Sequence, residues 1–248
     1  MGHDKLMSRL LNTAEAARVL RVSEGSIRRW SDSGLLPAVR VGRRRERRFN
    51  ESDLLAFVDR TASRQSAAAV VTLGGTAVHT PIHLAPLYST DAGGLRLTVP
   101  FLAEGIRLAQ PSFLVASDAV LTRYLEALEA EDGDDLRRAR DGGLFTVVRF
   151  EEGNGPAAIR QLERLFGAAL ATRQTLIRLV GEMASVRTMF DSVDEMLRFE
   201  EAFEVFFRRY PIAAICQYDV CLFDGVSLLR ALKAHPDLFG LRIGTFLN

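Results

Sequence analysis

The sequence predicts an α/β protein with two unequal domains: a small helical domain that carries a basic hairpin, and a larger domain built on a mostly parallel sheet. Short helical segments fill the first 60 residues, whereas beyond residue 80 short apolar runs alternate with segments of helical periodicity. Charge is also divided unevenly, because residues 1–65 contain 14 Lys/Arg and 8 Asp/Glu, and the remainder contains 18 and 23. A basic module followed by an acidic one indicates that only the first touches a polyanion.

We expect the first domain to span residues 1–62, a linker 63–79, and the second domain 80–248. The linker is rich in small residues and has few large apolar ones, which is typical of a tether. Gly74 and Gly75 within it are also compatible with a hairpin turn at the entry of the second domain.

Composition limits the class of protein. Of the 248 residues, 48% are hydrophobic and 25% are charged, which is typical of a globular chain and excludes general disorder. The two cysteines, Cys216 and Cys221, make no disulfide framework, so a reducing compartment is expected. We find no signal-like leader and no apolar run of 18 residues, and we therefore expect a cytoplasmic protein without a membrane partner.

The first domain has the spacing of a helix-turn-helix. Asn12 or Thr13 can cap a helix, and Glu15 can complete a capping box with Asn12. Ser23 begins a second helix after only two or three residues, and Gly34 is expected to end it. Apolar residues at helical spacing give each helix one buried face.

The second helix is the expected recognition helix. Ile27 and Trp30 lie three residues apart and therefore share the buried side. Ser26, Arg28 and Arg29 are left on or near the exposed side, where a helix that enters the major groove needs hydrogen-bond donors.

A basic hairpin is expected at residues 38–49, AVRVGRRRERRF, with its turn at Gly42. It contains six arginines: Arg40, Arg43, Arg44, Arg45, Arg47 and Arg48. Guanidinium groups bind phosphates in a fork and enter narrow minor grooves. A charged edge strand that resists aggregation is the alternative, but so dense a cluster of like charge favours a polyanionic partner. Asn50 is expected to cap a third helix that closes the small core.

The pattern T-x-x-x-A-x-x-L-x-V-S-x-x-S-I-R-R-W-x-x-x-G-L-L-P, followed by the basic hairpin, resembles the MerR/excisionase/BldC group of winged helix-turn-helix domains over residues 10–60. The resemblance implies double-stranded DNA as a partner, with a major-groove helix around Ser26–Arg29 and a wing on the flanking backbone or minor groove. The long coiled-coil helix of the MerR plan does not follow residue 60. Dimerisation must come from elsewhere, and a homodimer is expected because one small module covers few base pairs.

The second domain is expected to be a parallel sheet covered by helices on both faces. Strands are expected at 112–117, 144–150, 175–183 and 212–220. Helices are expected at 94–109, with Pro100 in an early turn, and at 118–130, 156–171, 193–210 and 225–235. The phenylalanines of helix 193–210 are interpreted as core.

In such sheets a ligand binds beyond the carboxyl ends of the strands. That rule indicates Ser117–Asp118, Glu151–Glu152, Glu182–Met183 and Gln217–Asp219. The ligand-binding candidates are His83, Tyr88, Asp118, Glu182, Gln217, Tyr218 and Asp219.

A second resemblance covers residues 80–245. The segments HLAPLY, VPFLAEGIRLAQ, FLVAS, RLVGEM and ICQYDV, in this order and followed by a helix that ends in HP, are similar to the MEDS (DcmR-type) sensory domain. The resemblance implies a ligand-sensing domain with a RecA/KaiC-like core that lacks the catalytic apparatus. The preferred hypothesis is a transcriptional regulator whose second domain binds a small-molecule or nucleotide effector. The alternative is a nucleotide-hydrolysing enzyme or dimerisation scaffold with a DNA-targeting module.

Neither catalysis nor a bound cofactor is predicted. A phosphate-binding loop needs a lysine and a hydroxyl after its glycines, and LAPLYSTDAGGLRL supplies neither. Nucleotide binding without hydrolysis stays open, because helix N-termini hold phosphates. His79 and His83 with Cys216 and Cys221 are possible metal ligands, but their placement in the sequence does not favour a site, and no metal is expected.

Overall fold

The computed structural model describes residues 10–20, 23–32, 36–55, 57, 69–172 and 176–248. The chain divides into two compact units, Met1–Ala67 and Ala68–Asn248, which are described separately. Among the described residues, no helix is both long enough and apolar enough to span a membrane.

The first unit is a small three-stranded sheet with helices packed on it. Its elements are β1 (Leu10–Leu11), α1 (Thr13–Leu20), α2 (Glu24–Asp32), β2 (Val39–Val41) and β3 (Glu46–Asn50), followed by helical residues at 51–55 and 57. The strand order is β1-β3-β2, with antiparallel pairs throughout. Its core consists of Leu11, Ala16, Ala17, Ile27, Leu36, Phe49 and Leu54.

The expected start signals of the first two helices are present. The Asn12 amide donates to Glu15 Oε2 at 2.8 Å, and the Glu15 amide donates to Asn12 Oδ1 at 2.9 Å. This reciprocal pair is a capping box, which satisfies two amides that the helix leaves unpaired. Ser23 Oγ accepts the Ser26 amide at 3.1 Å and caps α2 in the same way. The predicted helix stop at Gly34 lies outside the described residues.

The second unit contains a six-stranded sheet whose strands all pair in parallel, which confirms the expected mixed α/β class. The strand order is β6-β11-β10-β8-β9, and β7 also pairs with β11. The strands are β6 (Ile82–Leu84), β7 (Leu87–Tyr88), β8 (Ser112–Val115), β9 (Phe145–Val148), β10 (Ile177–Glu182) and β11 (Ile212–Asp219). Each of the four expected strands is present, shortened by one to three residues.

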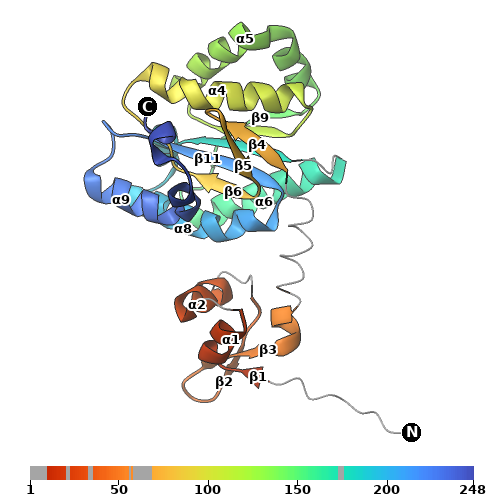
Figure 1. Cartoon of the computed structure of the whole chain (residues 1–248), viewed down its shortest axis with the longest axis vertical. Coiled ribbons are helices and arrows are strands. Elements are labelled where there is room, and N and C mark those ends of the chain that lie inside the picture. The colour runs from red at the N-terminus through yellow and green to blue at the C-terminus, as the bar shows by residue number, and fades with distance from the viewer. Residues whose placement is uncertain (1–9, 21–22, 33–35, 56, 58–68, 173–175) are drawn as a thin grey trace. The chain divides into compact units, whose positions relative to one another are not determined.

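Helices cover both faces of this sheet (Figure 1). One face carries α4 (Asp91–Arg107) and α5 (Asp118–Asp141), and the other carries α6 (Gly155–Thr172), α8 (Val193–Phe206) and α9 (Gly225–Ala234). Short helices α7 (Met183–Val186), η1 (Arg187–Met189), η2 (Phe207–Arg209), η3 (Pro236–Gly240) and η4 (Ile243–Phe246) complete the unit. The phenylalanines of α8 are buried in the second of these layers, as expected.

Three features differ from the sequence-based expectations. Residues 70–79 form no tether but the alternative that Gly74 and Gly75 left open, a hairpin of β4 (Val70–Leu73) and β5 (Thr76–His79), because Val71, Leu73 and Val78 bury their side chains in the core of the second unit. Helix α4 begins at Asp91, so Pro100 lies inside the helix and not in its first turn. Helix α5 continues to residue 141 past a break at residue 132.

A buried arginine joins α4 to the centre of the sheet. Arg178 of β10 is 1% exposed. It donates to Gln110 Oε1 at 2.7 Å, to the Phe101 carbonyl at 2.8 Å and to Glu104 Oε2 at 2.7 Å. Gly105 permits this approach, since a Cβ there would lie 2.5 Å from Arg178 Cδ. The charge is therefore buried only together with its partners, as such a group must be.

Arg178→Met should destabilise the chain by about 3 kcal/mol, because it removes the cation from Glu104 and the donor from the Phe101 carbonyl. The measurement is the urea midpoint of the full chain. Arg137→Met is the matched control, since that side chain is 73% exposed and pairs only along α5. It should change stability by no more than about 0.5 kcal/mol. Equal losses in both variants would contradict the structural role of Arg178.

Candidate functional site

The first unit presents an exposed basic hairpin. Its turn is made by Gly42 (φ 75°) and Arg45 (φ 48°), and the Arg45 amide donates to the Gly42 carbonyl at 3.0 Å. The side chains of Arg43, Arg44 and Arg45 are exposed in this turn. The hairpin therefore places three guanidinium groups at the tip, where they can reach a phosphate backbone.

The remaining arginines of the hairpin have partners within the unit. Arg40 and Arg47 both pair with Asp32, the last residue of α2, and Arg48 pairs with Glu46 at 2.8 Å. These contacts fix the base of the hairpin beside the end of α2. The six arginines thus divide into three at the tip and three that hold or line the base.

The candidate residues of α2 lie on its outward side. Ile27 is fully buried, whereas Arg28 and Arg29 are exposed and Ser26 is half-buried. Arg28 donates to Glu24 Oε2 at 2.7 Å, and Arg29 Nη2 lies 3.5 Å from Ser26 Oγ. These are exposed contacts that a competing phosphate or base edge can replace at little cost. Helix and hairpin together form one basic surface.

In the second unit, three of the predicted ligand-binding residues meet at the carboxyl ends of the strands. Tyr88 donates its hydroxyl to Glu182 Oε1 at 2.5 Å. Gln217 Nε2 donates to the Tyr124 hydroxyl at 2.5 Å, and that hydroxyl lies 3.1 Å from Thr98 Oγ1. This polar network, which we call the carboxyl-edge network, is buried beneath α4 and α5.

Electrostatics favour neutral phenols in this network. Burial, and then the neighbouring Glu182 carboxylate, raise the pKa of Tyr88 above its usual value. Burial likewise raises the pKa of Tyr124, against the hydrogen bond with Thr98, which lowers it. Sequence analysis did not select Tyr124 or Thr98, because both lie inside helices, where the only signal was a buried position.

The other predicted ligand residues lie elsewhere. Asp118 begins α5 with its side chain 89% exposed and pairs with Arg149. Asp219 accepts the Cys221 amide at 2.9 Å in the turn after β11. His83 and Tyr218 face the opposite side of the sheet, since alternate residues of a strand point to opposite faces. The seven residues therefore do not form one pocket in this structure.

His83 belongs to a second buried cluster, with Glu200 of α8, Cys216 of β11 and His235 after α9. Its Nε2 lies 3.2 Å from Cys216 Sγ and 3.8 Å from Glu200 Oε2, and His235 Nε2 lies 3.1 Å from that same oxygen. All four side chains are buried. We call this group the histidine cluster. His79 and Cys221, which sequence analysis considered beside His83 and Cys216, are exposed and lie outside it.

Burial controls the ionisation of the histidine cluster. Burial, followed by the charge of His235, lowers the pKa of His83 well below its usual value. Burial, followed by the Glu200 carboxylate, raises the pKa of the Cys216 thiol. Burial alone would also raise the pKa of Glu200, but His235, His83 and Cys216 outweigh it and lower that pKa. The cluster therefore has one buried carboxylate beside a neutral imidazole and a thiol.

Two backbone amides near the start of α4, where a phosphate cradle would lie, already have partners. The Ser89 amide donates to the Asn248 carbonyl at 3.0 Å, and the Gly93 amide donates to Thr90 Oγ1 at 3.1 Å. Gly94 packs against the Tyr88 ring, which a Cβ would approach to 3.2 Å. A phosphate would have to displace these contacts.

Comparison with known proteins identifies both units. Residues 82–236 match the MEDS family, described as the methanogen/methylotroph, DcmR sensory domain, and residues 10–62 match a helix-turn-helix domain family. The transcriptional repressor DcmR of Methylorubrum extorquens is 36% identical over 246 residues, which cover 93% of this chain and 91% of the repressor. A KaiC-like protein from Pyrococcus horikoshii OT3 matches with a TM-score of 0.49 and 16% identity, over 66% of this chain and 78% of its own.

These matches confirm the predicted combination of a helix-turn-helix domain and a MEDS sensory domain, whereas the MerR-type subdivision stays a prediction. Because the sensory-domain match spans more than half of the chain, and the repressor aligns along nearly all of it, the chain belongs to the MEDS family.

Proposed function

We propose that the chain is a transcriptional regulator that binds double-stranded DNA through its first unit. The observation that carries this proposal is the exposed arginine tip beside the outward face of α2. The relative that aligns along nearly the whole chain is named a transcriptional repressor, which supports the same function. In this arrangement α2 lies in the major groove and the hairpin contacts the flanking backbone or minor groove. The DNA-contacting residues are Ser26, Arg28, Arg29, Arg40, Arg43, Arg44, Arg45, Arg47 and Arg48.

Replacement of Arg43 and Arg44 by alanine should weaken binding to all DNA sequences alike and flatten its salt dependence. Each lost phosphate contact reduces the slope of log K against log salt by about 1, so the double variant should lose about 2. Fluorescence anisotropy with labelled duplexes at several salt concentrations measures this slope. Arg137→Ala with Arg138→Ala is the charge-matched control, because both are exposed arginines of α5.

Arg29→Ala should behave differently, because a recognition-helix side chain discriminates among bases. The loss is expected to be about 1–3 kcal/mol on the preferred operator and small on random DNA. An unchanged affinity in both the Arg29 variant and the double hairpin variant at moderate salt would remove this surface from the proposal.

The second unit is proposed to bind an effector at the carboxyl-edge network. Tyr88, Glu182 and Gln217 converge there from three strands, which is where ligands bind in open parallel sheets. The family description as a sensory domain supports this role. The effector would exchange hydrogen bonds with these side chains and favour one conformation of the unit, and DNA affinity would follow the population of that conformation.

A small molecule with hydrogen-bonding groups fits this site better than a nucleotide that is hydrolysed. Residues 83–98 contain no lysine, and the amides of Ser89 and Gly93 are already paired. Nucleotide hydrolysis is therefore not part of the proposal. Nucleotide binding without hydrolysis remains an outcome of the effector screen.

Tyr88→Phe and Glu182→Gln should abolish the effector response and leave DNA binding intact. A ligand present at a hundredfold excess over its Kd stabilises the folded chain by about 2.7 kcal/mol, and loss of a hydrogen bond to a charged group weakens affinity by about tenfold or more. Thermal shifts of the full chain with ATP, cyclic di-GMP and dissolved short-chain hydrocarbons provide the readout. Tyr210→Phe, on the other face of the sheet, is the matched control. Identical shifts in all variants would exclude this site.

We propose that the regulator acts as a homodimer in the cytoplasm, where its DNA partner lies. A single helix and hairpin read few base pairs, so two copies on a palindromic operator are expected. Light scattering of the full chain should give twice the chain mass of 27.5 kDa at micromolar concentration. A monomer both free and on DNA would contradict this.

A further inference from the structure

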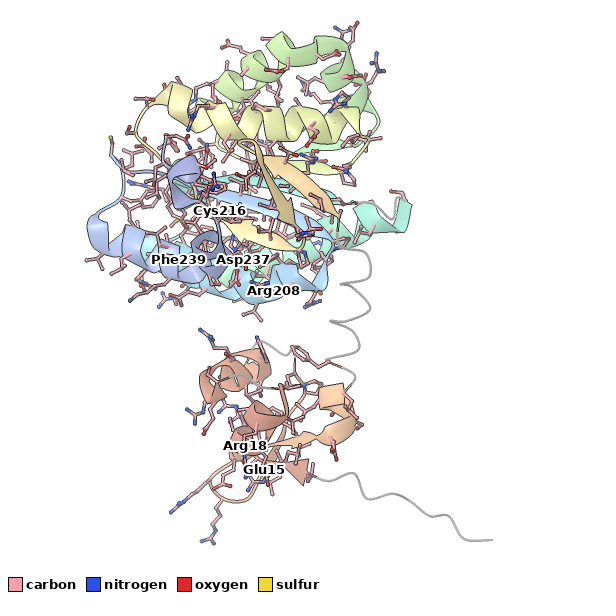
Figure 2. The ribbon with its side chains drawn as sticks, in the orientation of Figure 1. Glu15, Arg18, Arg208, Cys216, Asp237 and Phe239 are labelled. Atoms are coloured by element: carbon pink, nitrogen blue, oxygen red, sulfur yellow. The ribbon has the colours of Figure 1, made fainter. Side chains whose placement is uncertain are left out.

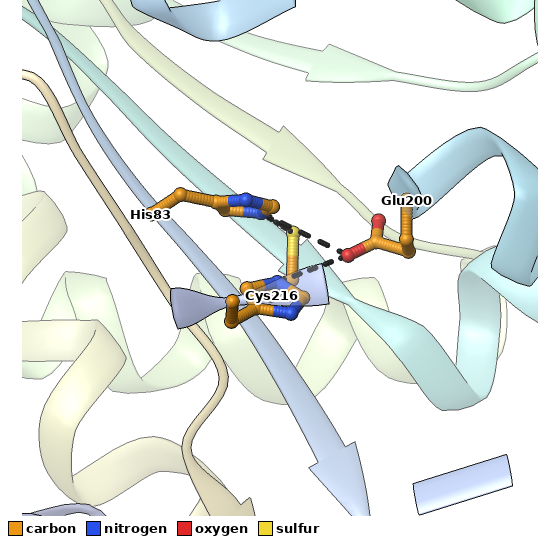
Figure 3. Close-up of side chains that lie close together, drawn as sticks. His83, Glu200 and Cys216 are labelled. Atoms are coloured by element: carbon orange, nitrogen blue, oxygen red, sulfur yellow. Dashed lines mark hydrogen bonds and ion pairs between the residues drawn. The ribbon is translucent and has the colours of Figure 1, made fainter. Parts of the chain in front are cut away.

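The histidine cluster brings four side chains of metal-binding type to one point. His83 comes from β6, Glu200 from α8 and Cys216 from β11 (Figure 3). His235 follows α9. One ligand atom from each residue lies within 4.8 Å of the others. The four residues are spread over more than 150 positions of the chain, so only the fold assembles them.

The spacing of these atoms fits a tetrahedral zinc ion. Zinc bonds of about 2.0–2.3 Å place neighbouring ligand atoms about 3.3–3.8 Å apart in a tetrahedron. The distances from His83 Nε2 to Cys216 Sγ (3.2 Å), from His83 Nε2 to Glu200 Oε2 (3.8 Å) and from His235 Nε2 to Glu200 Oε2 (3.1 Å) lie close to that range. The remaining pairs lie within 4.8 Å, so the side chains have to close by up to about 1 Å to reach this range.

The outward nitrogen of each imidazole has an acceptor. His235 Nδ1 lies 2.7 Å from the Ala231 carbonyl, which can only accept, so Nδ1 carries a proton and Nε2 is the nitrogen that faces the cluster. His83 Nδ1 lies 3.2 Å from Glu204 Oε2, which orients that ring in the same way. A carboxylate or a backbone carbonyl behind each histidine is the usual support of metal-bound imidazoles.

A further shell holds this support in place. Arg208 donates to Glu204 Oε1 at 2.7 Å and to Asp237 Oδ1 at 3.0 Å, and Asp237 Oδ2 accepts the His83 amide at 3.2 Å. Figure 2 shows Arg208 and Asp237 side by side below Cys216. His83, whose Nε2 faces the cluster, is thus held in place both at its ring Nδ1 and at its backbone amide.

The inner atoms of the cluster face one another in a fully buried space. Both oxygens of Glu200, the Nε2 of His235 and the hydroxyl of Tyr218 are buried, and their polar neighbours among the described residues are one another, His83 and Cys216. His235 Nε2 faces Glu200 Oε2 at 3.1 Å. In a buried site this contact is favourable only when a proton or a metal cation lies between the two atoms.

We propose that His83 Nε2, His235 Nε2, Glu200 Oε2 and Cys216 Sγ bind one Zn²⁺ ion. Imidazole nitrogens with one thiolate and one carboxylate suit zinc, and four protein ligands make a closed site of the structural kind. Binding converts the Cys216 thiol to thiolate and releases its proton to solvent. The two anionic ligands balance the two positive charges of the ion, so the complex is neutral, as its fully buried position requires. The ion joins β6, β11, α8 and the segment after α9.

This proposal goes beyond the regulatory function and is tested separately from it. The full chain, purified without chelator, should contain about one equivalent of zinc by elemental analysis. After zinc is removed, Co²⁺ should give the visible absorption of a tetrahedral site together with a sulfur-to-cobalt charge-transfer band. Cys221→Ser should retain this band. Since the chain has only two cysteines, retention identifies Cys216 as the thiolate even if Cys216→Ser fails to fold.

Two further variants locate the remaining ligands. Glu200→Gln should weaken cobalt binding by at least about tenfold, as loss of one ligand or its support does, whereas His79→Gln should not. In the alternative arrangement no metal is bound, and a protonated His235 Nε2 donates a hydrogen bond to Glu200 Oε2. Folded wild-type chain with less than about 0.1 equivalent of metal and no tetrahedral cobalt spectrum would establish that arrangement and overturn the proposed site. Equal cobalt affinity in the Glu200 variant and the wild type would also overturn it.

Discussion

The central sheet of the second unit is buried on both faces, and this constraint governs every polar side chain on its strands. A parallel sheet covered by helices leaves no water to satisfy a polar group, so each must find a partner inside the protein. Arg178 does so with Glu104 and the Phe101 carbonyl, and Glu182 does so with Tyr88. Glu200 does so with His235, His83 and Cys216, the side chains that we propose to bind zinc.

The alternation of residues along β11 separates the two candidate sites. Cys216 and Tyr218 face α8 and α9, whereas Gln217 between them faces α5. The carboxyl-edge network and the histidine cluster therefore lie on opposite faces of one strand. An effector that rearranges the carboxyl-edge network would leave the proposed zinc ligands of the histidine cluster in place. The proposed sensing and the proposed structural zinc site are therefore compatible.

Local signals in the sequence were sufficient for the features that depend on neighbouring residues. The capping box of Asn12 and Glu15, the basic hairpin and the four central strands follow from spacing, turn residues and apolar runs. The histidine cluster does not, because Glu200 and His235 meet His83 only through packing of α8 and α9 against the sheet. The expectation of a ligand at the carboxyl ends of the strands stays a prediction. Tyr88, Glu182 and Gln217 lie together there, whereas His83 and Tyr218 face the other side of the sheet, because the sequence analysis did not apply strand parity to them.

The hydrogen bonds of the carboxyl-edge network limit the free energy that an effector bound there could contribute to regulation. Tyr88–Glu182 and Gln217–Tyr124 each join separate elements, so an effector that replaces one of them changes how α5 or β7 meets the sheet. The free energy gained by such a replacement is only the difference between the new hydrogen bonds and the old ones. That difference is about 1 kcal/mol for a neutral pair and larger where Glu182 takes part. A coupling of about 1 kcal/mol would change DNA affinity about fivefold, and one of about 3 kcal/mol about 150-fold. Strong regulation would therefore depend on Glu182, the only charged member of the network.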